Sequence, residues 1–139
     1  RKAMIEKYDS SNLIIMCAAV CDHKPKFKWQ QKKKKDQFPQ NIEMIPNEDI
    51  LEELGQRKRE FQTLVGFAAE TENGVQNALQ KLKKKNLDWI ALNDISNKNI
   101  GFGSENNEIT LFSSLGKKVK FEFSSKEDLA TAMFEVILK

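Results

Sequence analysis

Acidic side chains follow two short apolar runs that have the length and composition of strands. Asp22 comes shortly after the run Leu13–Ala19, and Asp94 comes shortly after Trp89–Leu92. In an open parallel sheet, ligands bind where strands end and loops begin, so acids in matching positions favour a binding site. Each acid could cap a helix, or bind a base, a ribose or a metal-bound phosphate. The residues alone leave these alternatives open.

Lysine side chains are concentrated in two segments, Lys24–Lys35 and Lys81–Lys85. On a helix Lys81 and Lys85 share one face, because residues four apart are neighbours, whereas the lysines between them point elsewhere. Such a pair could reach over a sheet edge toward an anion, and the first segment could add positive charge around it. A lysine run is also common on a solvated edge that resists aggregation. Both interpretations of the first segment remain open.

A strand–helix–strand unit between Thr63 and Ser96 positions these side chains. Leu64–Ala68 and Trp89–Leu92 are apolar runs typical of parallel strands covered on both faces. Between them, apolar residues recur at the helical spacing i, i+3, i+4, i+7, which predicts a buried helix face made of Val75, Ala78, Leu79 and Leu82. The loops after the two strands carry the polar side chains of the expected site, namely Glu70, Thr71, Glu72, Asn93, Asp94 and Ser96.

The N-terminal part predicts a helix ending near Tyr8, the strand Leu13–Ala19, and then a basic flap. In the flap, Phe27 and Trp29 alternate with polar residues as in a strand exposed on one face, with Ile42–Ile45 as its return strand. Asn47 is the expected N-cap of the next helix.

The C-terminal part predicts an antiparallel hairpin and a final helix. Glu108–Phe112 and Lys117–Phe123 alternate in polarity around a short polar turn. Ser124 stands three residues before Glu127, as in a capping box. The two glycines of Gly101–Gly103 precede no helix, so they do not form a dinucleotide fingerprint and indicate a loop.

The composition describes one soluble globular domain. Its 139 residues include 40% hydrophobic and 31% charged residues, with a formal net charge of +3. Cys17 and Cys21 have no second pair and no histidine cluster, which disfavours a disulfide framework or a zinc site and fits a reducing cytoplasm. His23 has no local nucleophile partner for a catalytic triad. We expect neither a membrane span nor a nucleic-acid surface.

Six motifs occur in the order found in phosphopantothenoylcysteine synthetases, and together they cover nearly the whole chain. They are Asn12–Asp22 with Ala-Ala-Val-x-Asp, Asn47-x-Asp49-Ile50-Leu51, Gly66-Phe67-Ala68-Ala69-Glu70-Thr71, Lys85-Asn86-Leu87-Asp88, Asn93-Asp94-Ile95-Ser96 and Gly101-Phe102-Gly103-Ser104-x-x-Asn107. The chain therefore resembles this family of phosphopantothenate–cysteine ligases of coenzyme A biosynthesis.

The resemblance implies an α/β fold, with a Rossmann-like, mostly parallel sheet, flanking helices, the basic flap and the C-terminal antiparallel hairpin. It implies a single nucleotide-binding ligase domain over residues 1–139, as a homodimer in the cytoplasm. Family members use CTP with Mg²⁺ to activate 4'-phosphopantothenate as an acyl-cytidylate, which cysteine then attacks to form an amide. In many bacteria a flavin-dependent decarboxylase is fused to the ligase.

The resemblance also assigns roles by motif position, and none of the assigned residues is a direct metal ligand. Lys32 would be the catalytic flap lysine and would also contact the nucleotide, and Ala19 would contact phosphopantothenate. The other nucleotide-binding residues would be Met16, Cys17, Ala18, Asp22, Glu48, Asp49, Ile50, Leu51, Phe67, Lys81 and Lys85.

The chain departs from the family pattern in three places. The family's hydrophobic or arginine positions in the flap are occupied by other residues here. Glu48 stands where the family usually has proline, and the glycine-rich phosphate loop with its asparagine has no counterpart after Arg1. We expect that loop to precede Arg1 in the natural protein. The alternative is a non-catalytic nucleotide-binding or basic interaction module, whereas a Rossmann oxidoreductase is disfavoured by the missing glycine fingerprint.

Overall fold

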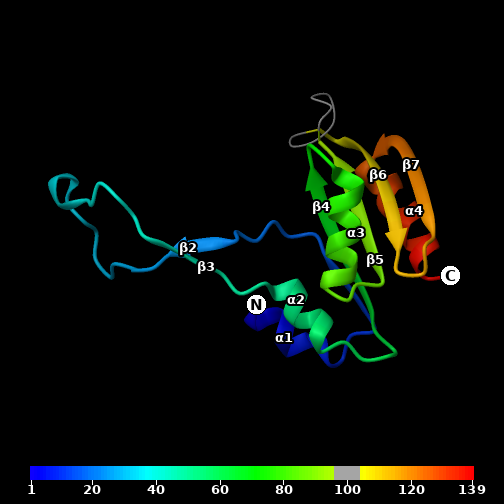
Figure 1. Ribbon diagram of the computed structural model, residues 1–139, viewed down its shortest axis with the longest axis horizontal. Coiled ribbons are helices and arrows are strands. Elements are labelled where there is room, and N and C mark those ends of the chain that lie inside the picture. Colours follow the sequence, from blue (N-terminus) through cyan, green and yellow to red (C-terminus); the bar gives the residue numbers. More distant parts are fainter. Residues whose placement is uncertain (96–103) are drawn as a thin grey trace. The chain divides into compact units, whose positions relative to one another are not determined.

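The computed structural model describes residues 1–95 and 104–139, apart from the side chain of Asp94. The chain divides into two compact units (Figure 1). Unit 1 consists of Arg1–Cys17 together with Ile50–Lys139, and unit 2 consists of Ala18–Asp49. The expectation of one ligase domain stays a prediction.

Unit 1 contains four helices among its described residues and one sheet. The helices are α1 (Lys2–Tyr8), α2 (Ile50–Gln56), α3 (Gly74–Lys84) and α4 (Lys126–Ile137). The strands are β1 (Leu13–Met16), β4 (Thr63–Glu70), β5 (Trp89–Asp94), β6 (Asn106–Ser113) and β7 (Lys118–Ser125).

The sheet of unit 1 is mixed, with the strand order β1-β4-β5-β6-β7. The strands β1, β4 and β5 are parallel, with Ile15 beside Val65 and Phe67 beside Ala91. The strands β5, β6 and β7 are antiparallel neighbours. This confirms the expected α/β fold, including the C-terminal hairpin.

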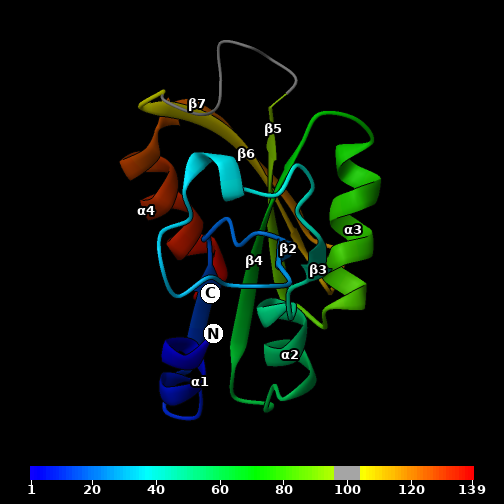
Figure 2. The same ribbon diagram turned by 90° about the vertical axis from the view of Figure 1, so that its left-hand side faces the viewer.

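Helices cover both faces of the sheet, and β4 shows how its residues are divided between them. Leu64 and Ala68 belong to the core under α1, α2 and α3, whereas Val65 and Phe67 belong to the core under α4. Successive side chains of a strand point to opposite faces, so one strand supplies both cores. Figure 2 shows α3 and α4 on opposite sides of the sheet.

The buried face of α3 differs from the predicted one. Ala78 and Leu82 are buried as expected, but Val75 is 47% exposed and Leu79 is 44% exposed. The helix is instead turned so that Asn77 and Lys81 are half-buried beside the two core residues. These two side chains contact Glu70 at the end of β4, and a pattern of apolar residues cannot reveal such polar contacts.

Strand β1 is shorter than predicted, because it ends at Met16 instead of Ala19. Its last partner in β4 is Gly66, while β4 itself continues to Glu70 beside β5. The carboxyl ends of the parallel strands are therefore staggered. Beyond Met16 the residues Cys17–Ala19 are exposed.

Unit 2 is a hairpin whose return strand overlaps the predicted Ile42–Ile45, whereas its first strand is not the predicted one. Strand β2 (His23–Pro25) pairs antiparallel with β3 (Met44–Pro46), and a short 3-10 turn covers Lys35–Gln37. The predicted strand around Phe27 and Trp29 is wrong. Strand β2 ends at Pro25, and one further backbone hydrogen bond follows it, from the Lys26 N–H to the Glu43 carbonyl over 2.9 Å.

Two predicted helix caps are also wrong. Helix α2 begins at Ile50, and the Asn47 side chain donates to the Cys21 carbonyl over 2.7 Å instead of capping the helix. Helix α4 is capped by Ser125, whose hydroxyl accepts from the Asp128 N–H over 3.1 Å. The capping box is thus displaced by one residue from the predicted Ser124, because β7 continues through Ser125.

The expected loop around Gly101–Gly103 and the candidate Ser96 lie outside the described residues. So does the side chain of Asp94, although its backbone ends β5.

Candidate functional site

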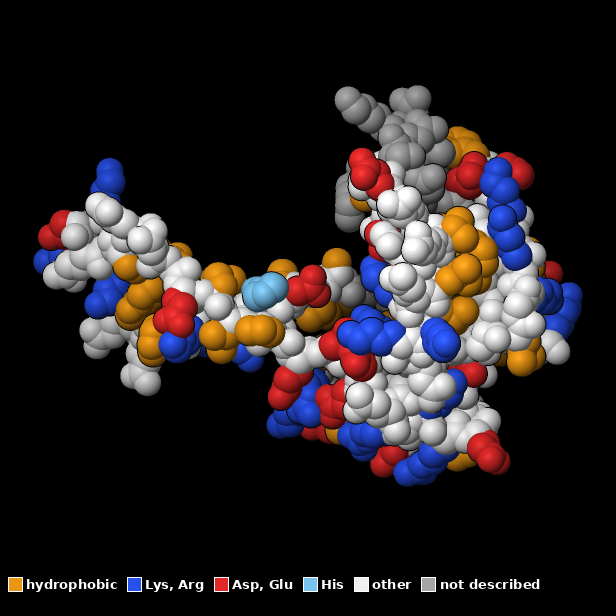
Figure 3. All heavy atoms as spheres, in the orientation of Figure 1, with side chains coloured by type: hydrophobic (Ala, Val, Ile, Leu, Met, Phe, Trp, Pro, Cys, Tyr) orange, Lys and Arg blue, Asp and Glu red, His pale blue; other side chains and the backbone are white. Residues whose placement is uncertain are grey.

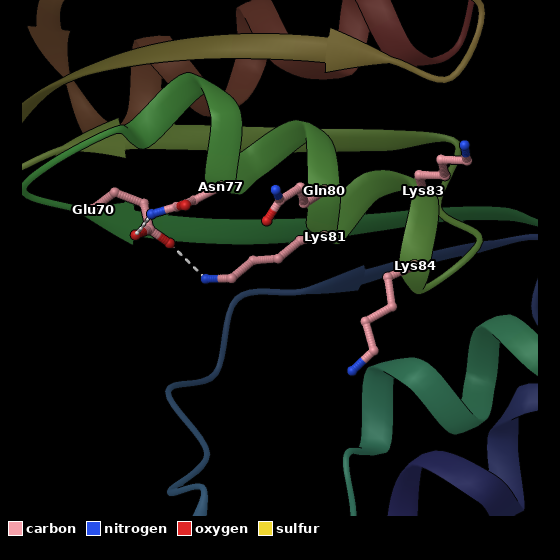
Figure 4. Close-up of a pocket in the computed structure, with 6 residues that line it drawn as sticks. All are labelled: Glu70, Asn77, Gln80, Lys81, Lys83 and Lys84. Carbon is pink, nitrogen blue, oxygen red and sulfur yellow. Dashed lines mark hydrogen bonds and ion pairs between the residues drawn. The ribbon is translucent and has the colours of Figure 1, made fainter.

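The carboxyl end of β4 carries the candidate site that the structure describes in most detail. Glu70 is the last residue of this strand and lies beside Asp94 of β5. A pocket of about 710 Å³ opens here on the α3 face, and its lining is polar and basic (Figure 4). It is lined by Glu70, Asn77, Gln80, Lys81, Lys83 and Lys84.

Glu70 is held by two side chains from α3. Lys81 Nζ donates to Glu70 Oε1 over 2.5 Å, and Asn77 Nδ2 donates to Glu70 Oε2 over 2.9 Å. The hydrogen bond from Lys81 is the main reason that the pKa of Glu70 lies below its ordinary value, with a further contribution from Asn77 against the opposing effect of burial. The carboxylate is therefore ionised at neutral pH, and both of its oxygens have a fixed partner.

The pocket lysines point in different directions. Figure 4 shows Lys81 reaching to Glu70, whereas Lys83 and Lys84 point away from it. Lys84 pairs with Glu52 of α2 over 3.2 Å. Lys81 is therefore the pocket lysine held at the end of β4, and the three lysines do not converge on one point.

Lys85 lies at the end of α3, where that helix packs closely on α2. A Cβ atom at Gly55 would lie 1.8 Å from the Lys85 carbonyl oxygen, so only glycine allows this contact. Asn86 has a left-handed backbone (φ 50°), and its side chain donates to the Gly55 carbonyl over 2.9 Å. Leu51 of α2 packs under β4, since its Cδ2 atom lies 2.9 Å from an ideal Cβ built on Gly66.

A second pocket, of about 610 Å³, lies on the α4 face of the sheet and is mainly apolar. Cys17 and Phe67 line it with residues of α4, and Asn107 and Lys126 are polar members of its wall. Cys17 is exposed as a whole residue, but desolvation by the surrounding protein raises the pKa of its thiol. Phe67 and Lys81, both predicted to bind the nucleotide, therefore lie on opposite faces of the sheet.

The remaining predicted site residues belong to unit 2. They are exposed side chains of irregular segments, and the Asp22 carbonyl accepts from the Asn47 N–H over 2.7 Å. These residues are Ala18, Ala19, Asp22, Lys32, Glu48 and Asp49. Unit 1 holds the others, which are Met16, Cys17, Ile50, Leu51, Phe67, Lys81 and Lys85.

Sequence reasoning assigned no role to four polar residues of these pockets, namely Asn77, Gln80, Asn107 and Lys126. Asn77 lies beside Lys81 on α3, and their spacing of four residues could have predicted a shared face. Asn107 and Lys126 gave no such signal, because β6 and α4 meet only in the folded sheet.

Among the described residues, no group of three or more His, Cys, Asp or Glu side chains could hold a metal ion. In the same part of the chain, no helix has the length and apolar character needed to cross a membrane.

The fold is that of an α/β domain with a basic pocket at the carboxyl end of a parallel strand, where open parallel sheets commonly bind ligands. The chain belongs to the family described as DNA/pantothenate metabolism flavoprotein C-terminal domain, whose model matches residues 1–139. The family-level resemblance inferred from the six motifs is thereby confirmed.

Relatives of known name are similar over almost the whole chain. It is 41% identical to the coenzyme A biosynthesis bifunctional protein CoaBC of Bacillus subtilis (strain 168), over 99% of this chain and 33% of that protein. It is 38% identical to a cysteine/cysteine sulfinic acid decarboxylase from an unknown prokaryotic organism, over 99% of this chain and 38% of that protein. The chain thus spans little more than a third of these relatives.

The fold is also similar to a solved structure. The crystal structure of the C-terminal domain of CoaBC superposes with a TM-score of 0.77 at 30% identity, covering 98% of this chain and 58% of that one.

Proposed function

We propose that this chain is the nucleotide-binding part of a CTP-dependent phosphopantothenate–cysteine ligase. The family and the similarity to CoaBC support a role in coenzyme A biosynthesis. The structural observation that carries the proposal is Lys81, which is held at the carboxyl end of a parallel strand inside a basic pocket. Phosphates are bound by positioned cations of this kind.

The proposed reaction has two steps. The carboxylate of 4'-phosphopantothenate attacks the α-phosphate of CTP, forming an acyl-cytidylate and releasing pyrophosphate. The amine of cysteine then attacks the acyl carbon, forming an amide and releasing CMP. The first step is needed because a carboxylate is a poor acyl donor until one of its oxygens becomes part of a phosphate leaving group. Fixed cations stabilise the charge that develops as pyrophosphate leaves.

The residues of both units have assigned roles in this proposal. Lys81 of α3 and Lys85 at the C-cap of this helix bind the nucleotide, while Met16 at the end of β1 and the following Cys17 and Ala18 also contact it. Asp22 and the segment Glu48–Leu51 are also assigned to the nucleotide by their motifs. The assignment of Phe67 rests on its motif alone, because Phe67 lies on the α4 face of the sheet and Lys81 on the α3 face. The motifs assign Ala19 to phosphopantothenate and Lys32 to the reacting phosphate.

Mg²⁺ would accompany CTP in this reaction. The described residues do not offer a carboxylate cluster for it, and Mg²⁺ is commonly held mainly by substrate phosphates and water. No residue of the chain is therefore assigned to hold Mg²⁺.

We further propose that the ligase is a cytoplasmic homodimer, with a decarboxylase fused or associated as the relatives' names suggest. Apolar side chains gather along unit 2 (Figure 3). Phe27 is 63% exposed, Phe38 54% and Met44 48%. Exposed apolar patches commonly mark protein interfaces, so unit 2 is the proposed dimer contact.

A binding titration separates this proposal from a basic interaction module. We expect calorimetry on the full-length protein to detect CTP binding in the presence of Mg²⁺, and Lys81→Met to weaken it by about tenfold or more. Binding of single-stranded DNA without binding of CTP or ATP would instead favour the interaction module.

A further inference from the structure

We propose that Glu70 is a positioning residue for nucleotide binding, acting through Lys81. This inference rests on the proposed function, because it assumes that Lys81 contacts a nucleotide phosphate. Glu70 itself touches no phosphate in this account. Its role is to hold the ammonium group of Lys81 at the carboxyl end of β4.

The geometry around Glu70 is that of a fixed anchor. Its side chain is 15% exposed, while that of Lys81 is 44% exposed. Lys81 occupies one carboxylate oxygen and Asn77 occupies the other. The Asn77 side chain also donates to the Glu72 carbonyl over 3.3 Å. The loop after β4 therefore orients the Asn77 amide, which in turn holds the Glu70 carboxylate. The recessed carboxylate is ordered, and the ammonium in front of it remains accessible.

The orientation of α3 is consistent with this role. The helix leaves Val75 and Leu79 exposed, although both could have contributed to an apolar stripe. It turns Asn77 and Lys81 toward the sheet, where both reach Glu70. Val75 and Leu79 therefore remain partly exposed on one side of α3, while the polar contacts to Glu70 form on the other side.

A lysine paired with a carboxylate can still bind phosphate. The ammonium has three N–H donors. When one of them donates to Glu70, the other donors remain for an anion. A free lysine has a flexible four-carbon stem, and ordering that stem costs binding affinity. Protein kinases use a Lys–Glu ion pair in this way to hold the lysine that contacts ATP phosphates. Glu70 would pre-order Lys81 by the same physical means.

The opposing effect is repulsion between Glu70 and a phosphate. In the proposed arrangement the phosphate binds in front of the ammonium, so it lies farther from the Glu70 carboxylate than from Lys81. Coulomb energy falls with distance, and the attraction to Lys81 therefore exceeds the repulsion. If Glu70 instead acted as a competitor for Lys81, its removal would tighten binding.

A double-mutant cycle tests the inference. The dissociation constant for CTP with Mg²⁺ is measured by calorimetry for the full-length wild type, Glu70→Gln, Lys81→Met and the double variant. We expect Glu70→Gln to weaken binding by about tenfold when Lys81 is present, and by less than about twofold when Lys81 is methionine. A purely structural role would give the same loss in both backgrounds.

Two further variants keep the test decisive. Glu122→Gln makes the same charge change in the exposed pair of Glu122 with Lys120, 3.3 Å apart on β7, and should leave CTP binding unchanged. If Glu70→Gln does not fold cooperatively, Asn77→Ala serves in its place, because it frees one oxygen of Glu70 without removing its charge. It should give a smaller loss that also requires Lys81.

The outcomes separate the two proposals. If the wild type binds CTP and Glu70→Gln has an unchanged or lower dissociation constant, the positioning role is wrong but the proposed function stands. An equal loss in both lysine backgrounds has the same consequence. A wild type that binds neither CTP nor ATP overturns the proposed function and this inference together.

Discussion

At the scale of single residues, Glu70 connects the fold to the proposed site. It ends β4, and its two carboxylate oxygens accept hydrogen bonds from neighbouring turns of α3. Its low pKa follows mainly from the bond to Lys81. The same contacts thus hold the helix on the sheet and place a lysine at the pocket, so they should affect both stability and binding.

Glu70→Gln should reduce stability in a pH-dependent way. The pKa of Glu70 is lower in the folded protein than its ordinary value of 4.5, so its ionised form favours folding above that value. We expect a loss of about 1 kcal/mol at neutral pH, kept small because Lys81 is partly exposed to solvent. The difference from wild type should shrink as the pH falls below 4.5, through the lowered folded pKa. Urea unfolding at neutral pH and at about pH 3 measures it; a difference that grows in acid would contradict this account.

At the scale of elements, the cap of α4 offers a matched pair of serines. Ser125→Ala should destabilise the protein by about 1 kcal/mol, because it removes the hydroxyl that accepts from the Asp128 N–H. Ser124→Ala should cost less, since Ser124 is not the N-cap. Thermal or urea unfolding of both variants measures the difference. Equal losses would argue against Ser125 as the cap.

The sequence predicts which helices and strands exist better than it predicts which of their faces are buried and where they end. Apolar runs and alternation identified β4, β5 and the β6–β7 hairpin, because those signals arise from burial itself. The buried face of α3 was predicted only in part. Ala78 and Leu82 are buried as predicted, but Val75 and Leu79 are exposed, since Asn77 and Lys81 turn toward Glu70. The end of β1 and the cap of α4 depend on where neighbouring strands stop pairing, which local patterns do not contain.

At the scale of the whole molecule, the predicted site residues are divided between two compact units. Their identities came from ordered motifs and the resemblance that these carry. Lys32 of unit 2 and Lys81 of α3 are 49 positions apart in the sequence. Helix and strand periodicity therefore cannot predict that they belong to one site. The grouping of Glu70 with Asn77 and Lys81 required the three-dimensional structure.

The proposed dimer makes a prediction at this scale. Replacing the exposed Phe27 and Met44 of unit 2 by aspartate should weaken self-association by at least about tenfold, because the contact would lose apolar area and gain like charges. Sedimentation velocity over a concentration series measures this. Leu115→Asp is the control, since Leu115 is 95% exposed on the turn between β6 and β7. A wild-type monomer, or an equal effect of the control, would contradict the assignment of unit 2.

The most direct test of the central claim is pyrophosphate release by the full-length protein. With Mg²⁺ and CTP, release should require 4'-phosphopantothenate, and cysteine should then yield CMP and the amide product. Lys81→Met should lower kcat/KM for CTP by about tenfold or more, while Glu122→Gln should leave it unchanged. If neither CTP nor ATP supports release in the presence of phosphopantothenate, the proposed ligase function is wrong.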